Sequence, residues 1–319
     1  MDTNTVCIGY LTDVRRTYTF ETFVSFLNKI QNKDKVHLLM LVTEDISLKF
    51  FDDIIQSKLQ DLKYTILGFP SNNNYITKIK TFIKFTKDNN IKYCMKFDND
   101  LIVNNYVLDY MIDNVELLKN SDNLYITPSL SSGIPTTDMF IDDFFNESER
   151  EHIQSLFLKT TMPKELWGFD YSELNHHTIY TNNWNIDNFT NNLNNMDCYY
   201  KGIHPIRIDK NSIEYMNKIL MKNKDKIFEK QDYKIQTINN PNYLCNSIFL
   251  IDVNHYENLV HDSTLYVDPF DEVPVNKYCK LNKMKGLIIR NSFSVHPIYN
   301  TISGFAEIEK RFHLEFISA

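Results

Sequence analysis

Two kinds of segment alternate over the first hundred residues of the chain. Continuous apolar runs with the length of buried strands occupy residues 6–11, 37–42, 64–67 and 91–98. Between them, large apolar side chains recur every three or four residues, as on one face of a helix, at 20–30, 48–59 and 76–83. Buried strands that alternate with helices predict an α/β fold, Rossmann-like, with a mostly parallel central sheet flanked by helices.

The pattern becomes less regular in the second part of the chain. A helical pattern over 105–119 leads to an expected fifth strand at 124–128. Residues 136–240 lack a clear period, which predicts short helices and loops. Two further continuous apolar runs, at 245–252 and 286–290, predict two more buried strands.

Polar residues follow each of the first four predicted strands. In a parallel α/β sheet, ligands bind beyond the carboxyl ends of the strands, so these residues are candidates for a binding site. The four clusters are Thr12-Asp13, Glu44-Asp45, Ser71-Asn72 and Asp98-Asn99-Asp100.

The last of these clusters carries two carboxylates separated by one residue. On a strand, residues i and i+2 point the same way, so Asp98 and Asp100 are expected to converge on one hard cation. A divalent cation between carboxylates and a diphosphate is a common reason for such an arrangement. The chain has no Gly-x-Gly-x-x-Gly or Walker motif, which disfavours the usual dinucleotide and P-loop sites.

A second acidic pair, Asp271 and Glu272, opens a short helical pattern near the C-terminus. Phe270 and Val273 give this pair an apolar flank, which raises the proton affinity of a carboxylate. A base placed in this way could accept a proton from an attacking hydroxyl.

The segment from Lys96 to Asn104, with Asp98-Asn99-Asp100 at its centre, resembles the Asp-x-Asp motif of nucleotide-sugar glycosyltransferases of the GT-A type. It is also similar to the longer signature of their inverting, family-2-like members. The resemblance extends over the order of parts: a nucleotide half, the Asp-x-Asp motif, acceptor-side acids and a closing histidine.

The resemblance implies a role for each candidate residue. Asp98, Asp100 and His296 would hold Mn²⁺ or Mg²⁺, and Mn²⁺ accepts a nitrogen ligand more readily. Glu272 would be the catalytic base with Asp271 as the alternate, because the two acids stand in swapped order relative to the family's motif. The donor nucleotide would be bound by Thr12, Asp13, Glu44, Asp45, Lys78, Asp98 and Asn99.

The resemblance also implies one GT-A catalytic domain over residues 1–319. Residues 1–128 would form the nucleotide-sugar half. Residues 129–319 would form the acceptor half, with a helical, loop-rich insertion.

The composition of the chain limits the classes of binding partner and the cellular compartment that we expect. The net charge of −7 and the lack of a long basic run argue against nucleic acid or an anionic membrane as the main partner. The five cysteines are odd in number and show no Cys-x-x-Cys spacing, which favours reduced thiols. Residues 1–5 do not resemble a signal peptide, and no apolar run approaches the roughly 18 residues that span a bilayer. We therefore expect a cytoplasmic protein.

The leading hypothesis is a metal-dependent glycosyltransferase. It would transfer a sugar, with inversion, from a nucleoside diphosphate donor, expected to be a UDP-sugar, to a hydroxyl of a glycan, protein or small-molecule acceptor. Two alternatives stay open: a sugar nucleotidyltransferase, and a non-catalytic protein that binds carbohydrate or nucleotide.

Overall fold

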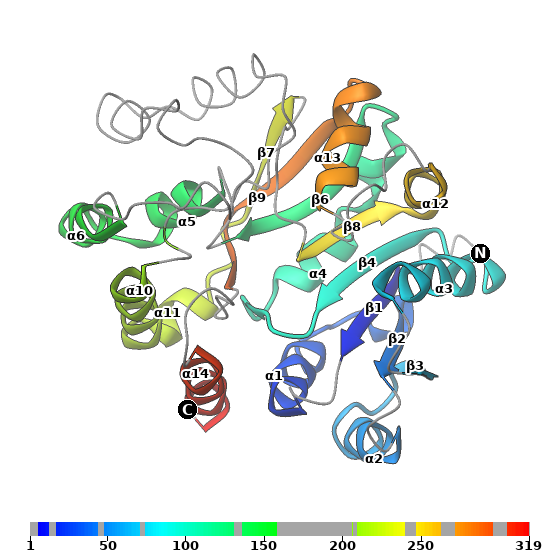
Figure 1. Cartoon of the computed structure of the whole chain (residues 1–319), viewed down its shortest axis with the longest axis horizontal. Helices are drawn as coiled ribbons and strands as arrows, with labels where there is room; N and C mark the ends of the chain where they lie inside the picture. The colour runs from blue at the N-terminus through cyan, green and yellow to red at the C-terminus, as the bar shows by residue number, and fades with distance from the viewer. Residues whose placement is uncertain are drawn as a thin grey trace.

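The computed structural model describes residues 6–12, 17–43, 48–70, 74–130, 136–157, 206, 209–239, 247–262, 272–295 and 305–318. Its described residues form one nine-stranded sheet with helices on both sides (Figure 1). The strand order is β3-β2-β1-β4-β8-β6-β9-β5, and β7 also pairs with β9. The strands are β1 (Val6–Thr12), β2 (Val36–Thr43), β3 (Lys63–Phe69), β4 (Tyr93–Asp98), β5 (Ile102–Val103), β6 (Asn123–Leu130), β7 (Lys234–Asn239), β8 (Ile248–Asp252) and β9 (Lys285–Val295).

Most of these strands run in one direction. β3, β2, β1 and β4 are parallel neighbours. β8 is antiparallel to both β4 and β6, so β6 and its parallel neighbour β9 share the direction of β4. β5 and β7 are antiparallel to β9. The prediction of a mixed α/β fold with a mostly parallel central sheet is confirmed.

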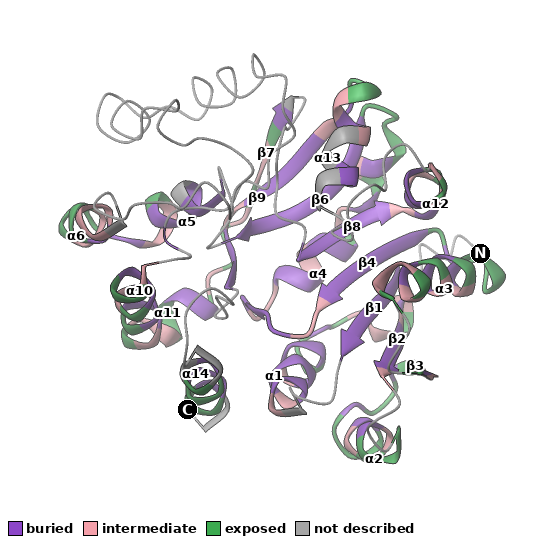
Figure 2. Cartoon of the chain, in the orientation of Figure 1, coloured by how far each residue is buried: buried purple, intermediate pink, exposed green. Residues whose placement is uncertain are grey.

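Alternate residues of the long central strands enter two different apolar cores, as a strand period of two requires. Val6, Ile8 and Tyr10 of β1 belong to the core on one face, whereas Cys7 and Leu11 belong to the core on the other. Figure 2 shows the central strands buried, the edge strand β3 less so, and the outer sides of the helices exposed. The helices are α1 (Thr17–Asn28), α2 (Leu48–Lys58), α3 (Tyr75–Asp88), α4 (Val107–Asp113), α5 (Thr136–Phe144), α6 (Glu147–Phe157), α10 (Lys210–Lys222), α11 (Lys224–Phe228), α12 (Val253–His261), α13 (Glu272–Leu281) and α14 (Phe305–Ser318), with 3-10 turns at Lys33–Lys35 and Val115–Lys119.

Helix α3 illustrates how the sequence sets these elements. The Asn74 side chain caps its start by accepting a hydrogen bond from the Thr77 backbone N–H at 2.9 Å. Ile79, Phe82 and Ile83 then recur at helical spacing and are buried against the sheet. A Cβ at Gly9 of β1 would lie 2.7 Å from the Phe82 ring, so only glycine allows this helix to pack so closely.

The structure corrects several predicted boundaries. The helix predicted over 105–119 is divided into α4 and a 3-10 turn at Asn114, whose side-chain amide bonds the Tyr110 carbonyl at 2.8 Å. β7 was missed within the region read as loops and helices, because only Ile235 and Ile238 of its residues are apolar, and their spacing of three does not match a strand period of two. β9 is longer than predicted, because it continues through the polar residues Asn291 and Ser292.

None of the helices in the described ranges has both the length and the apolar character needed to cross a membrane.

Candidate functional site

The connections of the sheet reverse direction beside β1. The chain moves from β1 to β2 and β3, then returns to place β4 on the other side of β1. In doubly wound sheets, ligands bind at such a point, outside the carboxyl ends of the strands. The register pairs Leu11 with Asp98, so the sequence after β4 emerges beside Thr12 at the end of β1. Figure 1 shows the two strands side by side.

Asp98 is held by a lysine two residues earlier on the same face of β4. Lys96 Nζ lies 3.0 Å from Asp98 Oδ1, and the exposed fractions of the two side chains are 2% and 27%. The ammonium also lies 5.5 Å from the centroid of the Tyr75 ring. Because a buried ammonium requires a compensating charge, this ion pair fixes the Asp98 carboxylate at the carboxyl end of β4.

Asn99 and Asp100 lie in the turn that follows β4. Strand β4 ends at Asp98, so the turn, rather than strand periodicity, sets the direction of the Asp100 carboxylate. Tyr10 Oη donates a hydrogen bond to the Asn99 carbonyl at 3.4 Å, and the Asp98 N–H donates to the Ser247 carbonyl at 2.9 Å. The Asp100 residue is only 4% exposed. The turn is therefore anchored on both sides and holds a buried acid.

Lys78 joins the carboxyl ends of the first two strands. Its Nζ donates to Thr43 Oγ1 at 2.7 Å, and this hydroxyl donates to the Thr12 carbonyl at 3.4 Å. The ammonium also lies 6.0 Å from the centroid of the Phe69 ring at the end of β3. The structure thus brings Thr12 and Lys78 to the same edge of the sheet as Asp98, Asn99 and Asp100.

Several predicted residues lie outside the described part of the chain. These are Asp13, Glu44, Asp45, Ser71, Asn72, Asp271 and His296. Glu272 begins α13, but its side chain lies outside the described residues as well.

Asp98 and Asp100 are the two predicted metal ligands that lie in the described part of the chain. Within the described ranges, no three His, Cys, Asp or Glu side chains are grouped to hold a metal ion. Asp98 and Asp100 supply two carboxylates, and Mg²⁺-type sites commonly use one or two carboxylates together with substrate phosphates. The residues present therefore fit a divalent cation that a diphosphate would share.

Sequence reasoning gave no role to Lys96. The signal was present, because a lysine in an otherwise apolar strand, two residues before an acid, is expected to be buried beside that acid. The supporting contacts from Tyr10, Thr43 and Ser247 come from elements distant in sequence, and no local pattern indicates them.

No protein-family model matches the sequence, and no curated protein matches it. Among solved structures, the mannosyltransferase PcManGT from Pyrobaculum calidifontis, in complex with GDP-Man and Mn²⁺, is 11% identical over 39% of this chain and 34% of its own, with a TM-score of 0.33. A cytidylyltransferase from Leptospira borgpetersenii serovar Hardjo-bovis is 16% identical over 39% of this chain and 53% of its own, with a TM-score of 0.30. The matches thus span about a third and about half of those two chains. The fold assignment rests on the order of the strands in the sheet and on the two apolar cores.

Proposed function

We propose that this protein is a metal-dependent glycosyltransferase that uses a nucleoside diphosphate sugar, with a UDP-sugar as the proposed donor. One observation carries the proposal: Thr12, Lys78 and the Asp98-Asn99-Asp100 turn meet at the carboxyl edge of the sheet, where its connections reverse. At this edge Lys78 supplies an ammonium group, and Asp98 and Asp100 supply two carboxylates. This combination suits a diphosphate with its divalent ion.

In this proposal, the residues along β1 and β2 bind the nucleoside and the diphosphate. Lys78 places its ammonium toward the phosphates, and Thr12, Asp13, Glu44 and Asp45 contact the base and ribose. Lys96 holds Asp98 in position and balances one of the two acidic charges, which reduces repulsion of an anionic donor. Asp98, Asp100 and His296 would hold Mn²⁺ or Mg²⁺, and the bound ion would neutralise charge on the departing diphosphate.

On the acceptor side, we propose which carboxylate acts as the catalytic base. Glu272, with Asp271 as the alternate, would take the proton from the acceptor hydroxyl as its oxygen attacks the anomeric carbon, which would invert that carbon. A Glu272→Gln variant should lose turnover by about a hundredfold or more while binding the donor normally. Full turnover in Glu272→Gln and a loss in Asp271→Asn would assign the base to Asp271 instead.

A thermal-shift panel of nucleotide sugars, with and without Mn²⁺, tests the proposal. One donor should raise the melting temperature only when metal is present, because a ligand at about 100 times its Kd adds about 2.7 kcal/mol of stability. Asp100→Asn should abolish this shift, whereas Asp88→Asn, which removes the same charge from the exposed end of α3, should leave it intact. The absence of any metal-dependent donor shift would refute the proposal, and a shift with a nucleoside triphosphate alone would favour the nucleotidyltransferase.

A further inference from the structure

A cavity of about 470 Å³ lies among helices α5, α6, α10 and α11. Among the described residues, its lining includes Lys222, Lys226 and Lys230 and two acids, Asp143 and Glu149. The protein as a whole has a net charge of −7, so a lining with more lysines than acids departs from the average surface. The volume lies within the usual range for small-molecule sites, about 300–1,000 Å³.

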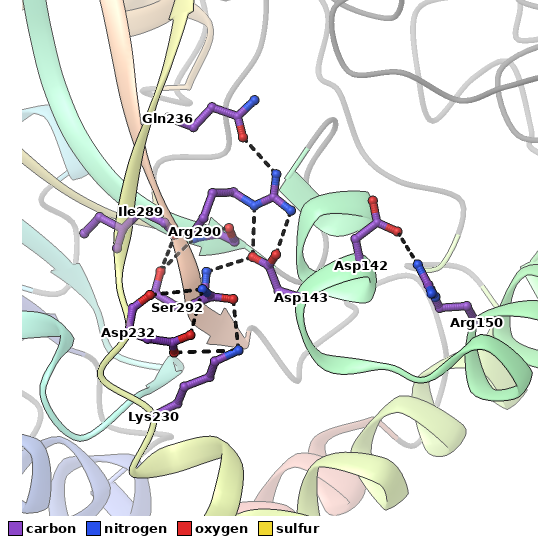
Figure 3. A network of polar contacts seen from close by, with 11 residues as sticks. Asp142, Asp143, Arg150, Lys230, Asp232, Gln236, Ile289, Arg290 and Ser292 are labelled. Carbon is purple, nitrogen blue, oxygen red and sulfur yellow. Dashed lines mark hydrogen bonds and ion pairs between the residues drawn. The ribbon is translucent and has the colours of Figure 1, made fainter.

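Both acids in the lining are already engaged. Arg290 donates from Nε and Nη2 to the two Asp143 carboxylate oxygens at 2.9 and 2.6 Å, and the Asn291 N–H donates to Asp143 Oδ2 at 2.8 Å (Figure 3). Burial alone would lower the pKa of Arg290, but the hydrogen bonds with Asp143 and the negative charges of Asp143 and Asp142 together raise it, which keeps the guanidinium charged. Glu149 accepts the Asn146 N–H at 3.1 Å at the start of α6. The charge of Asp143 is therefore balanced by Arg290, whereas Glu149 is engaged by a backbone N–H at the start of the helix.

The three lysines, in contrast, form a row with a spacing of four residues along α10, α11 and the turn after it. Lys222 and Lys226 are exposed and have no hydrogen-bond or ion-pair partner in the described part of the chain. Lys230 Nζ lies 2.9 Å from Asn291 Oδ1 and 3.8 Å from Asp232 Oδ1, and its ammonium is 5.2 Å from the centroid of the Phe144 ring. Two ammonium groups thus remain available to a ligand beside a third that the protein holds in place.

Two lining residues of the cavity, Asp143 and Lys230, contact a bulge in β9. The pairing of β6 with β9 moves from Pro128–Ile289 to Leu130–Ser294. Residues 290–293 of β9 are therefore not paired with β6. Asn291 has a φ of 59°, a left-handed conformation that non-glycine residues adopt at some energetic cost. Figure 3 shows Asp143, Lys230 and Asp232 gathered around this bulge. Bulges of this kind are common next to functional sites.

One lining residue of the cavity is hydrogen-bonded to the segment that follows the Asp98-Asn99-Asp100 turn. The segment after the Asp98-Asn99-Asp100 turn bonds directly to α11: Asn104 Nδ2 donates to the Ile227 carbonyl at 3.0 Å, and the Asn105 N–H donates to the Phe228 carbonyl at 3.1 Å. Ile227 lines the cavity. Residues 101–105 therefore link the Asp98-Asn99-Asp100 turn to helix α11, which lines the cavity.

We propose that this cavity binds an anionic group, phosphate or carboxylate, on a sugar acceptor. The inference rests on the proposed function, because it assigns the acceptor class of the same reaction. Lys222 and Lys226 supply charge-assisted hydrogen bonds to the anion, and Lys230 with Phe144 forms the adjoining wall.

Titration calorimetry at low salt tests this with three probes: glucose 6-phosphate, glucuronate and glucose. At least one of the two anionic sugars should bind, glucose should not, and added salt should weaken the binding. The comparison of glucose 6-phosphate with glucuronate identifies the anion. The Lys222→Ala/Lys226→Ala double variant should bind about tenfold more weakly or worse, and because both lysines are exposed it should fold normally.

The control is Lys210→Ala/Lys218→Ala, which removes the same charge from α10 outside this cavity and should bind as the wild type does. The inference is overturned if neither anionic sugar binds at millimolar concentration, or if the control loses as much affinity as the double variant. Nucleotide binding with Mn²⁺ is measured separately without sugar acceptors. Loss of that signal alone counts against the glycosyltransferase, and loss of sugar binding alone counts against the cavity.

Discussion

The ion pair between Lys96 and Asp98 should stabilise the protein measurably, and Lys96→Met tests this. Methionine keeps the length of the side chain but removes the ammonium that lies 3.0 Å from Asp98 Oδ1. Removing one partner of a fully buried pair costs about 3–5 kcal/mol. Lys96 is 2% exposed but Asp98 is 27% exposed, so water screens part of the loss and we expect about 1–2 kcal/mol.

Urea unfolding of four proteins measures this contribution: the wild type, Lys96→Met, Asp98→Asn and the double variant. The double variant should lose less stability than the sum of the single variants, with a coupling energy of about 1–2 kcal/mol. Lys84→Met is the control, because its pair with Asp88 is exposed and should contribute under about 0.5 kcal/mol. A coupling energy below about 0.5 kcal/mol would refute the claim that Lys96 fixes Asp98.

Three further predictions concern other parts of the fold. Gly9→Ala should lose about 1–3 kcal/mol in urea unfolding because its Cβ would lie 2.7 Å from the Phe82 ring, and an unchanged midpoint would contradict this packing. Asn217→Leu should gain about 1–2 kcal/mol, because both side-chain amide atoms of Asn217 are buried and have no hydrogen-bond partner among the described residues; a loss would show that the amide has a partner. Burial, and secondarily Lys63, lowers the pKa of His37, so folding opposes its protonation and stability falls as the pH drops below about 6.5. The melting temperature of His37→Gln should therefore fall less than that of the wild type between about pH 7.5 and about pH 5.5, and equal slopes would contradict this.

The parallel part of the sheet could be predicted because its signals are local. β1, β2 and β4 are mostly apolar runs buried on both faces, and β3 is a half-buried edge strand whose Tyr64, Ile66 and Leu67 pack against the cores. The helices between these strands show regular apolar spacing. β7 could not be predicted in the same way, because it lies at an edge and pairs only with β9 among the described strands. The bulge in β9 depends on its contacts with Asp143 and Lys230, which lie far away in sequence.

The candidate site was predicted in outline but not in its supporting contacts. The position of Asp98 beside the end of β1 follows from strand order, which the alternation of strands and helices indicates. The rule that residues i and i+2 of a strand point the same way does not apply to Asp100. β4 ends at Asp98, and Asp100 lies in the turn that follows. The link from Lys78 to Thr43 depends on the packing of α3 against β2, which a single sequence does not specify.

The central claim is that the acids at the end of β4 bind a cation together with a diphosphate. A crystal soaked with Mn²⁺ and uridine diphosphate, measured at a wavelength where manganese scatters anomalously, tests it most directly. We expect an anomalous manganese peak at about 2–2.3 Å from an Asp100 oxygen and from a phosphate oxygen. Diphosphate and manganese bound elsewhere, with no peak beside Asp98 or Asp100, would contradict it.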